Sequence, residues 1–394
     1  MDNFEFYAPT HVVFGKDTEN RTGELIAEAG GSRVFVLYGG GSVIRSGLLE
    51  KVEKSIEEAN LAYKVLGGIK PNPVLSFAEK ARQEAEDFGA DFIMAVGGGS
   101  VIDTAKAVAH GVANPGVPLW CFWSGKVPLK KSIPVGDVIT IPAAGSEMSN
   151  SSVLTNEETG EKKGLSTPLN RCRFSILNPA YLTTLPDYQL AAGITDIMMH
   201  TLERYFIPGS NAMLTDEIAE GLLRTVITCG RKALANKEDT DALGEILWAA
   251  SLSHNDLTHL GRCRDFCVHK FGHALSARYD VTHGASLASV WGSWALYVYE
   301  KCLPRFVRYA EKVWGITSEN EKEAARAGIE ATVAYFKEIG MPTSLNDLHI
   351  EMTDEDLHAL ALATTQNDTV AICKIEPLHA KECEEILHRA KEQQ

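Results

Sequence analysis

Residues 91–114, DFIMAVGGGSVIDTAKAVAHGVAN, are the stretch of sequence that decides the fold. The stretch opens with a continuous apolar run typical of a strand buried on both faces, and it then passes through three glycines at 97–99. Apolar residues at helical spacing follow. A strand that ends in a glycine turn before a helix is the repeating unit of a parallel sheet covered by helices, so the sequence predicts a strand at 91–97 and a helix at 101–114.

The same pattern occurs earlier, where SRVFVLYGGGS at 32–42 predicts a second buried strand that ends in glycines. Apolar periodicity predicts helices at 17–30, 48–60 and 74–89, and short strands at 62–69, within VPLWCFW at 117–123 and within DVITIPAAGSE at 137–147. The first 15 residues are expected to form two further short strands. This alternation predicts an α/β domain with a doubly wound parallel sheet and helices on both of its faces.

Strand patterns become rare after NPAYLTTLP at 178–186, and helical patterns continue to the end of the chain. We therefore predict two domains, an α/β domain at 1–186 and an all-α domain at 187–394. The cleft between two such domains is the expected ligand site.

Composition excludes several classes of partner. The net charge of −14, from 52 acidic and 38 basic residues, argues against binding to nucleic acid, which requires a basic face. No apolar run approaches the roughly 20 residues that span a bilayer, and the N-terminus has neither the basic nor the apolar region of a signal peptide. A cytoplasmic protein that contacts neither membrane nor nucleic acid is expected.

Histidines and one aspartate in the predicted helical domain suggest a metal site. Asp196 and His200 lie four residues apart in TDIMMHTLERYF, as do His269 and His273 in CVHKFGHALSA, and His283 follows in DVTHGASL. On helices each pair projects from one face, and imidazoles with one carboxylate are ligands that suit a divalent transition metal. Packed core histidines and solvated polar pairs are the alternative reading, and the clustering favours the metal.

Cysteines offer a second reading of this region, because Cys263 and Cys267 precede the second histidine pair. All four groups would lie within about three turns of one helix, which cannot close a tetrahedral zinc site without an intervening turn. The eight cysteines are scattered, so reduced core thiols are expected rather than disulfides.

Two glycine loops suggest that the α/β domain binds phosphate groups. Consecutive glycines let a bound group approach the backbone, and the N-terminus of the next helix offers free N–H donors. Neither loop has the G-x-G-x-x-G spacing of the standard dinucleotide motif. The loop at 142–147 is a third candidate. The residues of the two glycine loops are Gly39, Gly40, Gly41, Ser42, Gly97, Gly98, Gly99 and Ser100.

Three segments together resemble the iron-containing (group III) alcohol dehydrogenases, and are nearest to the butanol-dehydrogenase-like branch of that family. They are GGGSVIDTAK at 97–106, IPAAGSEMS at 141–149 and the aspartate–histidine set between 196 and 284. PTHVVFG at 9–15 and WGSWALYVY at 291–299 also look like that family. The resemblance thins after about residue 310 and implies a dinucleotide-binding domain followed by a helical metal-binding domain.

The resemblance also implies residue roles. Gly97, Gly98, Gly99 and Ser100 would hold the cofactor pyrophosphate, with Asp103 near the nicotinamide as a catalytic residue. His273 would stand beside the metal as a proton relay. The expected metal ligands are Asp196, His200, His269 and His283. Further residues expected along the cofactor are Asn72, on the adenosine side, and Thr140, Ser146, Ser149 and Lys162.

Cofactor and metal choice remain partly open. An acidic residue at the end of the strand near Tyr38 would bind the adenosine ribose and repel a 2′-phosphate, but here that place holds glycines and Ser42, followed by Arg45. NADP(H) is therefore favoured over NAD(H). The family resemblance implies iron(II), whereas the same ligands also take zinc(II), which the Irving–Williams order favours.

The expected activity is hydride transfer between NAD(P)(H) and a small aliphatic aldehyde or alcohol of the butyraldehyde and butanol type, by a homodimer. Alternatives on the same scaffold are a glycerol dehydrogenase and a cyclase of the dehydroquinate synthase type, although the residues around the ligands are more apolar than the cyclase needs. A non-catalytic dinucleotide sensor is the non-enzyme alternative. Trp120, Phe122 and Trp123 are candidates either for an apolar substrate pocket or for the core.

Overall fold

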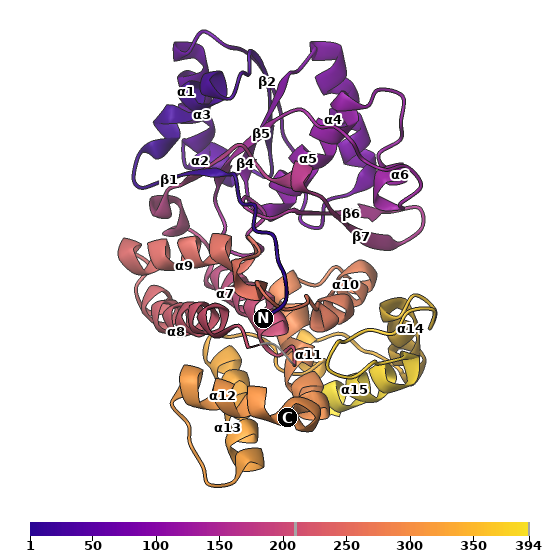
Figure 1. Cartoon of the computed structure of the whole chain (residues 1–394). Helices are drawn as coiled ribbons and strands as arrows, with labels where there is room; N and C mark the ends of the chain where they lie inside the picture. Colours follow the sequence, from indigo (N-terminus) through magenta and orange to yellow (C-terminus); the bar gives the residue numbers. More distant parts are fainter. Residues whose placement is uncertain (209–210, 393–394) are drawn as a thin grey trace. The chain divides into compact units, whose positions relative to one another are not determined.

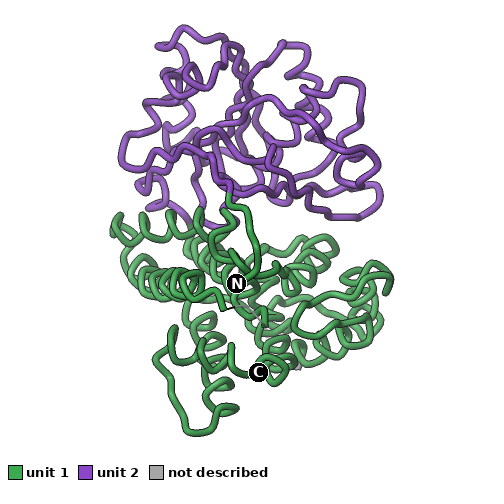
Figure 2. The backbone as a smooth tube through the Cα atoms, viewed as in Figure 1, with its two compact units in different colours: residues 1–6, 186–394 green, residues 7–185 purple. Residues whose placement is uncertain are grey.

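The computed structural model describes residues 1–208 and 211–392. Contacts between residues divide the chain into two compact units (Figure 2), one formed by Tyr7–Leu185 and the other by Met1–Phe6 together with Pro186–Gln394. We refer to them as the α/β unit and the helical unit. That the chain folds as two domains at 1–186 and 187–394 stays a prediction.

A parallel sheet forms the centre of the α/β unit (Figure 1). Within the described residues it has six strands in the order β1-β8-β5-β4-β2-β3, and every neighbouring pair is parallel. The predicted doubly wound α/β fold is confirmed. The strands are β1 (His11–Phe14), β2 (Arg33–Tyr38), β3 (Ala62–Leu66), β4 (Phe92–Gly97), β5 (Val135–Ile139) and β8 (Phe174–Leu177).

Helices cover the sheet on both faces (Figure 1). One core cluster joins apolar side chains of α1 and α3 to alternate residues of β2 and β4, such as Val34, Val36 and Met94. Alternation places these side chains on one face of the sheet. A second cluster joins α4, α5 and α6. The helices are α1 (Thr22–Glu28), α2 (Ser42–Arg45), α3 (Leu48–Glu58), α4 (Leu75–Phe88), α5 (Gly99–Ala113) and α6 (Trp120–Trp123).

Two of the predicted strands are wrong. Trp120–Trp123 forms the single helical turn α6 instead of a strand, and it packs Phe122 and Trp123 into the second core cluster. Trp123 Nε1 also donates a hydrogen bond to the Ser152 carbonyl, 3.0 Å away. Three aromatic residues in four are equally apolar in either conformation, so the local pattern could not distinguish them. The N-terminal 15 residues contain one strand, β1, instead of two.

An antiparallel hairpin, β6 (Ser151–Asn156) and β7 (Glu161–Ser166), stands outside the main sheet and was not predicted. β6 contacts α4 and α5. The chain that follows β5 therefore returns to contact α5, the helix that begins at the second glycine loop.

The second unit is helical throughout its regular structure, as the sequence predicted. Helix α7 lies at its centre and contacts α8, α9, α10 and α11. No helix in residues 1–208 and 211–392 is long and apolar enough to cross a membrane. The α-helices are α7 (Asp187–Tyr205), α8 (Met213–Ala235), α9 (Thr240–Ser253), α10 (Cys267–Tyr279), α11 (His283–Val298), α12 (Leu303–Trp314), α13 (Glu321–Glu338), α14 (Asp354–Thr364) and α15 (Ala380–Glu392).

Candidate functional site

Three helices of the helical unit bring the predicted metal ligands together. Asp196 and His200 lie one turn apart on α7, His269 lies in the first turn of α10, and His283 begins α11. The Asp196 Oδ1 atom is 3.4 Å from His200 Nδ1, 3.5 Å from His269 Nε2 and 3.7 Å from His283 Nε2. One carboxylate oxygen is thus surrounded by three imidazole nitrogens.

The atoms that face one another in this cluster fit a divalent metal ion. Asp196 Oδ1, His200 Nδ1 and His269 Nε2 are buried without a hydrogen-bond partner among the described residues, and the ligand atoms of these three residues lie within 4.8 Å of one another. Leaving a buried polar atom unpaired costs about 1–3 kcal/mol, so three such atoms at one point indicate that a ligand completes the site. Carboxylate and imidazole donors with this arrangement suit iron(II) or zinc(II).

The pKa values of the buried histidines His200 and His269 are shifted in opposite directions. Burial lowers the pKa of His200 well below its ordinary value, and the neighbouring His254 and His269 lower it further. Burial also opposes protonation of His269, but attraction by Glu203 and Asp196 outweighs it and raises the pKa to about 9. The two carboxylates face different nitrogens of the His269 ring, Glu203 at Nδ1 and Asp196 at Nε2, and both favour the protonated imidazole.

His273, the predicted proton relay, lies beside the cluster on α10. The centroid of its ring is 5.5 Å from that of His283 and 6.3 Å from that of His269. Of the four predicted ligands, His283 has the most exposed side chain, at 25%, compared with about 4% for Asp196. His273 is thus next to the most accessible ligand.

In the α/β unit, the two glycine loops lie at the same edge of the sheet. Tyr38 at the end of β2 is the register partner of Val96 near the end of β4, so Gly39–Gly41 and Gly97–Gly99 follow neighbouring parallel strands. The next strand, β5, ends beside Gly97, and the Thr140 N–H donates to the Gly97 carbonyl over 3.1 Å. Three predicted cofactor loops therefore meet at the carboxyl edge, where open α/β sheets bind ligands.

The glycines of these loops differ in the space around them. A Cβ on Gly97 would lie 2.6 Å from Val101 Cγ2, and one on Gly98 would lie 3.0 Å from Ile141 Cδ1. Those two glycines permit close packing within the loop. Nothing lies within 4 Å of a Cβ placed on Gly40, so its space is open to a bound group. The Gly98 N-cap position of α5 has no side-chain capping bond, so the first N–H groups of a 15-residue helix can bind an anion.

Asp103 and Ser146 lie together, but their polar atoms are engaged with the protein. Asp103 accepts a hydrogen bond from the Ser146 hydroxyl and another, 2.9 Å long, from the Val153 backbone N–H. Burial raises the pKa of Asp103, while Lys106 opposes the rise. The carboxylate thus joins α5 to the loop after β5.

Lys106 has no solvent exposure and faces the same loop. Its ammonium donates to the carbonyls of Ser146 and Ser151 over 2.7 and 2.8 Å, and to the Ser146 and Ser149 hydroxyls over 3.1 and 3.4 Å. Sequence reasoning did not single out this lysine, although its spacing of three residues from Asp103 places both on one side of α5.

The remaining predicted cofactor residues form a separate pair. Lys162 on β7 donates a 2.9 Å hydrogen bond to Asn72 Oδ1, and Asn72 has a positive φ of 55°. These two predicted residues are therefore adjacent to each other, in the same α/β unit as the glycine loops.

Comparison with known proteins agrees with this geometry. The model of the iron-containing alcohol dehydrogenase family matches residues 9–179, and the model of the C-terminal region of Fe-containing alcohol dehydrogenases matches residues 190–391. This chain belongs to the iron-containing alcohol dehydrogenase family.

Relatives within the family carry two kinds of name. The NADH-dependent butanol dehydrogenase A of Clostridium acetobutylicum is 36% identical over 392 residues, which cover 99% of this chain and 100% of the relative. The NADPH-dependent aldehyde reductase YqhD of Escherichia coli is 34% identical over 353 residues, which cover 89% of this chain and 90% of the relative. A crystal structure of NADH-dependent butanol dehydrogenase A from Thermotoga maritima has 36% identity and a TM-score of 0.95, with 99% of both chains covered.

These findings confirm that this family member is an oxidoreductase of the butanol-dehydrogenase-like type, with NAD(P)(H) and a divalent metal as its cofactors.

Sequence reasoning missed two residues that lie at the predicted metal site of this alcohol dehydrogenase. Glu203, on α7, accepts a hydrogen bond from His269 Nδ1. Its position seven residues after Asp196 places it on the same helix face, which is a signal that the sequence contained. The ring of His254 lies 4.1 Å from that of His200, centroid to centroid, and no motif in the sequence identified it.

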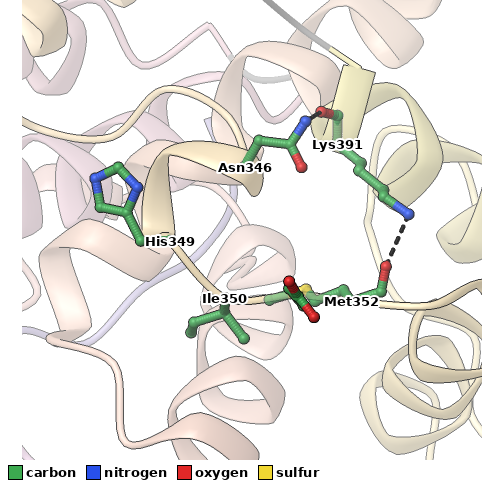
Figure 3. A pocket seen from close by; sticks show the side chains of 6 residues that line it. Asn346, His349, Ile350, Met352 and Lys391 are labelled. Atoms are coloured by element: carbon green, nitrogen blue, oxygen red, sulfur yellow. Dashed lines mark hydrogen bonds between the residues drawn. The ribbon is translucent and has the colours of Figure 1, made fainter.

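A separate pocket in the helical unit contains none of the predicted site residues (Figure 3). Asn346 Nδ2 donates to the Lys391 carbonyl over 2.7 Å, and Lys391 Nζ donates to the Met352 carbonyl over 2.7 Å. The Asn346 amide and the Lys391 ammonium at this pocket thus donate to backbone carbonyls of the protein itself. The residues that line it are Asn346, His349, Ile350, Glu351, Met352 and Lys391.

Proposed function

We propose that this chain interconverts small aliphatic aldehydes and alcohols of the butyraldehyde and butanol type, using NADP(H) in preference to NAD(H) and one iron(II) or zinc(II). The observation that carries the proposal is the group of three unpaired buried ligand atoms on Asp196, His200 and His269, in a chain that belongs to this family. His283, 3.7 Å from the Asp196 carboxylate, is the proposed fourth ligand.

The residues have separate tasks in this reaction. Asp196, His200, His269 and His283 would hold a divalent ion, which would supply Lewis-acid chemistry when bound, and a bound nicotinamide would supply or accept the hydride. The N–H groups at the start of α5 and the glycines at 97–99 bind the pyrophosphate. Asp103 and Lys106 keep the loop after β5 in position through the bonds described above. His273, beside His283, passes the alcohol proton to solvent.

NADP(H) preference is supported by the first glycine loop. Gly39, Gly40 and Gly41 follow β2, so no carboxylate stands where it would bind a ribose 2′-hydroxyl and repel a 2′-phosphate. A Cβ on Gly41 would lie 2.8 Å from Arg45 Nη1, so a guanidinium group lies over the loop. Arginine suits bidentate recognition of phosphate. Relatives named for NADH and for NADPH are similarly distant from this chain, so their names do not decide the preference.

The test is the rate of NADPH and NADH oxidation with butyraldehyde, measured on purified protein, after chelation and after Fe²⁺ or Zn²⁺ is restored. We expect activity to disappear on chelation and to return with one metal, and kcat/KM to be higher with NADPH. Metal-loaded protein that binds a dinucleotide but reduces neither butyraldehyde nor longer aldehydes would contradict the proposal.

We also propose a homodimer. Strand β1 forms one edge of the sheet, paired only with β8 within the described residues, and Phe14 at its end is 50% exposed. An open edge strand is a surface on which a second copy can pair across a two-fold axis. Light scattering after gel filtration should give twice the chain mass of 42.9 kDa; a monomer at micromolar concentration would exclude the dimer.

A further inference from the structure

Glu203 is a buried carboxylate on the same helix as two of the proposed metal ligands. Asp196, His200 and Glu203 occur at intervals of four and three residues on α7, which places all three on one face. The Glu203 side chain is 1% exposed. A carboxylate at this depth is retained only where it is paired or fully hydrogen-bonded.

All the hydrogen bonds that the structure gives this carboxylate come from the first turn of α10. Oε1 accepts from the backbone N–H of Val268 and, over 3.2 Å, from that of His269. Oε2 accepts from His269 Nδ1. One oxygen thus caps the helix, and the other binds the imidazole of a proposed ligand.

The bond to Nδ1 decides which nitrogen of His269 faces the metal cluster. A carboxylate can only accept, so Nδ1 carries a proton, and Nε2, which points toward Asp196 Oδ1 at 3.5 Å, is the nitrogen left to bind a metal ion once its own proton is displaced. Only the unprotonated nitrogen can bind a metal. When a divalent ion displaces the His269 Nε2 proton and the ligand histidines are neutral, the negative charges of Asp196 and Glu203 equal the charge of that ion.

We propose that Glu203 is a positioning residue of the metal centre, which fixes the tautomer and orientation of His269 and balances the charge of a bound divalent ion. The inference rests on the metal site of the proposed function. A helix cap alone would need only Oε1, since both backbone donors meet that atom; Oε2 serves the ligand histidine.

Glu203→Gln separates the two roles. The amide retains one acceptor oxygen for the backbone and presents an NH₂ group to the imidazole. Nδ1 must then accept, and the proton moves to Nε2, the atom that should bind the metal. Partners of this kind change metal affinity by about 10- to 100-fold, so the Kd of the full-length variant for Zn²⁺ should rise by that factor.

Asp265→Asn is the matched control. The Asp265 carboxylate accepts from the backbone N–H groups of Phe266 and Lys374, over 2.9 and 2.7 Å, in the segment that leads into α10. Both substitutions remove one buried negative charge close to this helix, but only Glu203 contacts a ligand histidine. The Asp265→Asn variant should bind Zn²⁺ within about twofold of the wild type.

The measurement is competition for Zn²⁺ between metal-free protein and a chelator, together with the visible absorption of the Co²⁺-loaded proteins. We expect weaker Zn²⁺ binding and a changed Co²⁺ spectrum for Glu203→Gln alone. Equal Zn²⁺ affinity and an unchanged spectrum would overturn the inference and leave the proposed function intact. Failure of the wild type to bind either ion would overturn the metal centre itself.

If Glu203→Gln does not fold, Glu203→Asp tests whether Glu203 positions His269 for metal binding. The shorter side chain keeps the charge but withdraws the carboxylate from His269 Nδ1. Zn²⁺ affinity should again fall, and wild-type affinity in a folded Glu203→Asp protein would overturn the inference.

Discussion

Among individual residues, Asp196 of the proposed metal cluster holds a buried carboxylate that faces three histidines. Asp196 Oδ1 is buried and has no hydrogen-bond donor, while three imidazole nitrogens surround it within 3.7 Å. Such a carboxylate is unfavourable in the metal-free protein and favourable with a divalent ion in place. The proposed metal site therefore accounts for this aspartate better than a role in folding does.

Asp196→Asn should abolish stoichiometric metal binding and lower kcat/KM by more than about 100-fold, because it removes a charged ligand rather than the partner of one. The metal-free variant should unfold at the same temperature as the metal-free wild type or a higher one. Elemental analysis and calorimetry test both expectations. Asp354→Asn, at a side chain that is 78% exposed in the same unit, is the control and should retain metal.

Glu19 is a second buried carboxylate, and its role is structural. It accepts hydrogen bonds from Lys51 on α3 and from Asn178 and Tyr181 near the end of β8. Burial opposes ionisation, but these three donors together outweigh it and lower the pKa of Glu19. Because the pKa of Glu19 is lower in the folded than in the unfolded protein, ionised Glu19 stabilises the fold fully above the ordinary carboxyl pKa of about 4.5. This contribution is lost as the pH falls through the lower pKa of the folded protein.

Glu19→Gln should lower the free energy of unfolding by about 2–3 kcal/mol at pH 7, below the usual 3–5 kcal/mol for a broken buried pair because Lys51 is 42% exposed. The difference from the wild type should shrink below about pH 4.5. Urea unfolding at pH 7 and pH 3.5 tests this. A difference that is constant with pH would show that Glu19 is not ionised in the folded protein.

At the scale of elements, Lys106 and Asp103 connect α5 to the loop after β5. Both come from one helix, and their partners lie 40 to 50 residues later, in the loop and in the first residues of β6. The start of the same helix supplies the glycine loop proposed to bind pyrophosphate. Two sides of the proposed cofactor site are therefore held at a fixed distance by buried polar contacts.

Lys106→Met should weaken dinucleotide binding at least tenfold and lower the free energy of unfolding by about 2–4 kcal/mol, because it leaves the Ser146 and Ser151 carbonyls without this donor. Calorimetric titration with NADPH and urea unfolding provide the two values. Lys80→Met, at an exposed position on α4, should change neither. Wild-type dinucleotide affinity in folded Lys106→Met would contradict the role of this lysine in positioning the loop.

At the scale of the whole molecule, the two proposed cofactors bind to different units. All four proposed metal ligands belong to the helical unit, and the glycine loops belong to the α/β unit. A ligand stabilises the part of a protein to which it binds, by about 2.7 kcal/mol at a concentration 100 times its Kd.

Chelation should therefore increase amide hydrogen exchange in α7, α10 and α11 and leave the strands of the α/β unit unchanged. Addition of NADPH should instead decrease amide hydrogen exchange in the α/β unit and leave α7, α10 and α11 unchanged. Hydrogen exchange with mass spectrometry of the peptides measures this directly. An equal change in both units after chelation would show that the two are energetically coupled.

Features that depend on short-range periodicity, namely the alternation of strands and helices and the side chains that share a helix face, were predictable from the sequence alone. A strand, a glycine turn and a helix follow one another within about 25 residues, as at 91–114, and this pattern predicted the parallel sheet and the places where its strands end. The four-residue spacing of Asp196 with His200, and of His269 with His273, predicted which side chains share a helix face. Family resemblance then joined these local patterns into one expected metal-binding set.

Only the tertiary structure decided the contacts between distant segments. Glu203 and His269 are 66 residues apart and Lys106 and Ser146 are 40 apart, so no local period connects them. Whether Trp120–Trp123 formed a strand or a helical turn was likewise decided by the core into which it packs. The conformation of a short segment sets which of its side chains share a face. The residues that those side chains contact depend on how whole helices and strands pack together, and no single stretch of the chain specifies that packing.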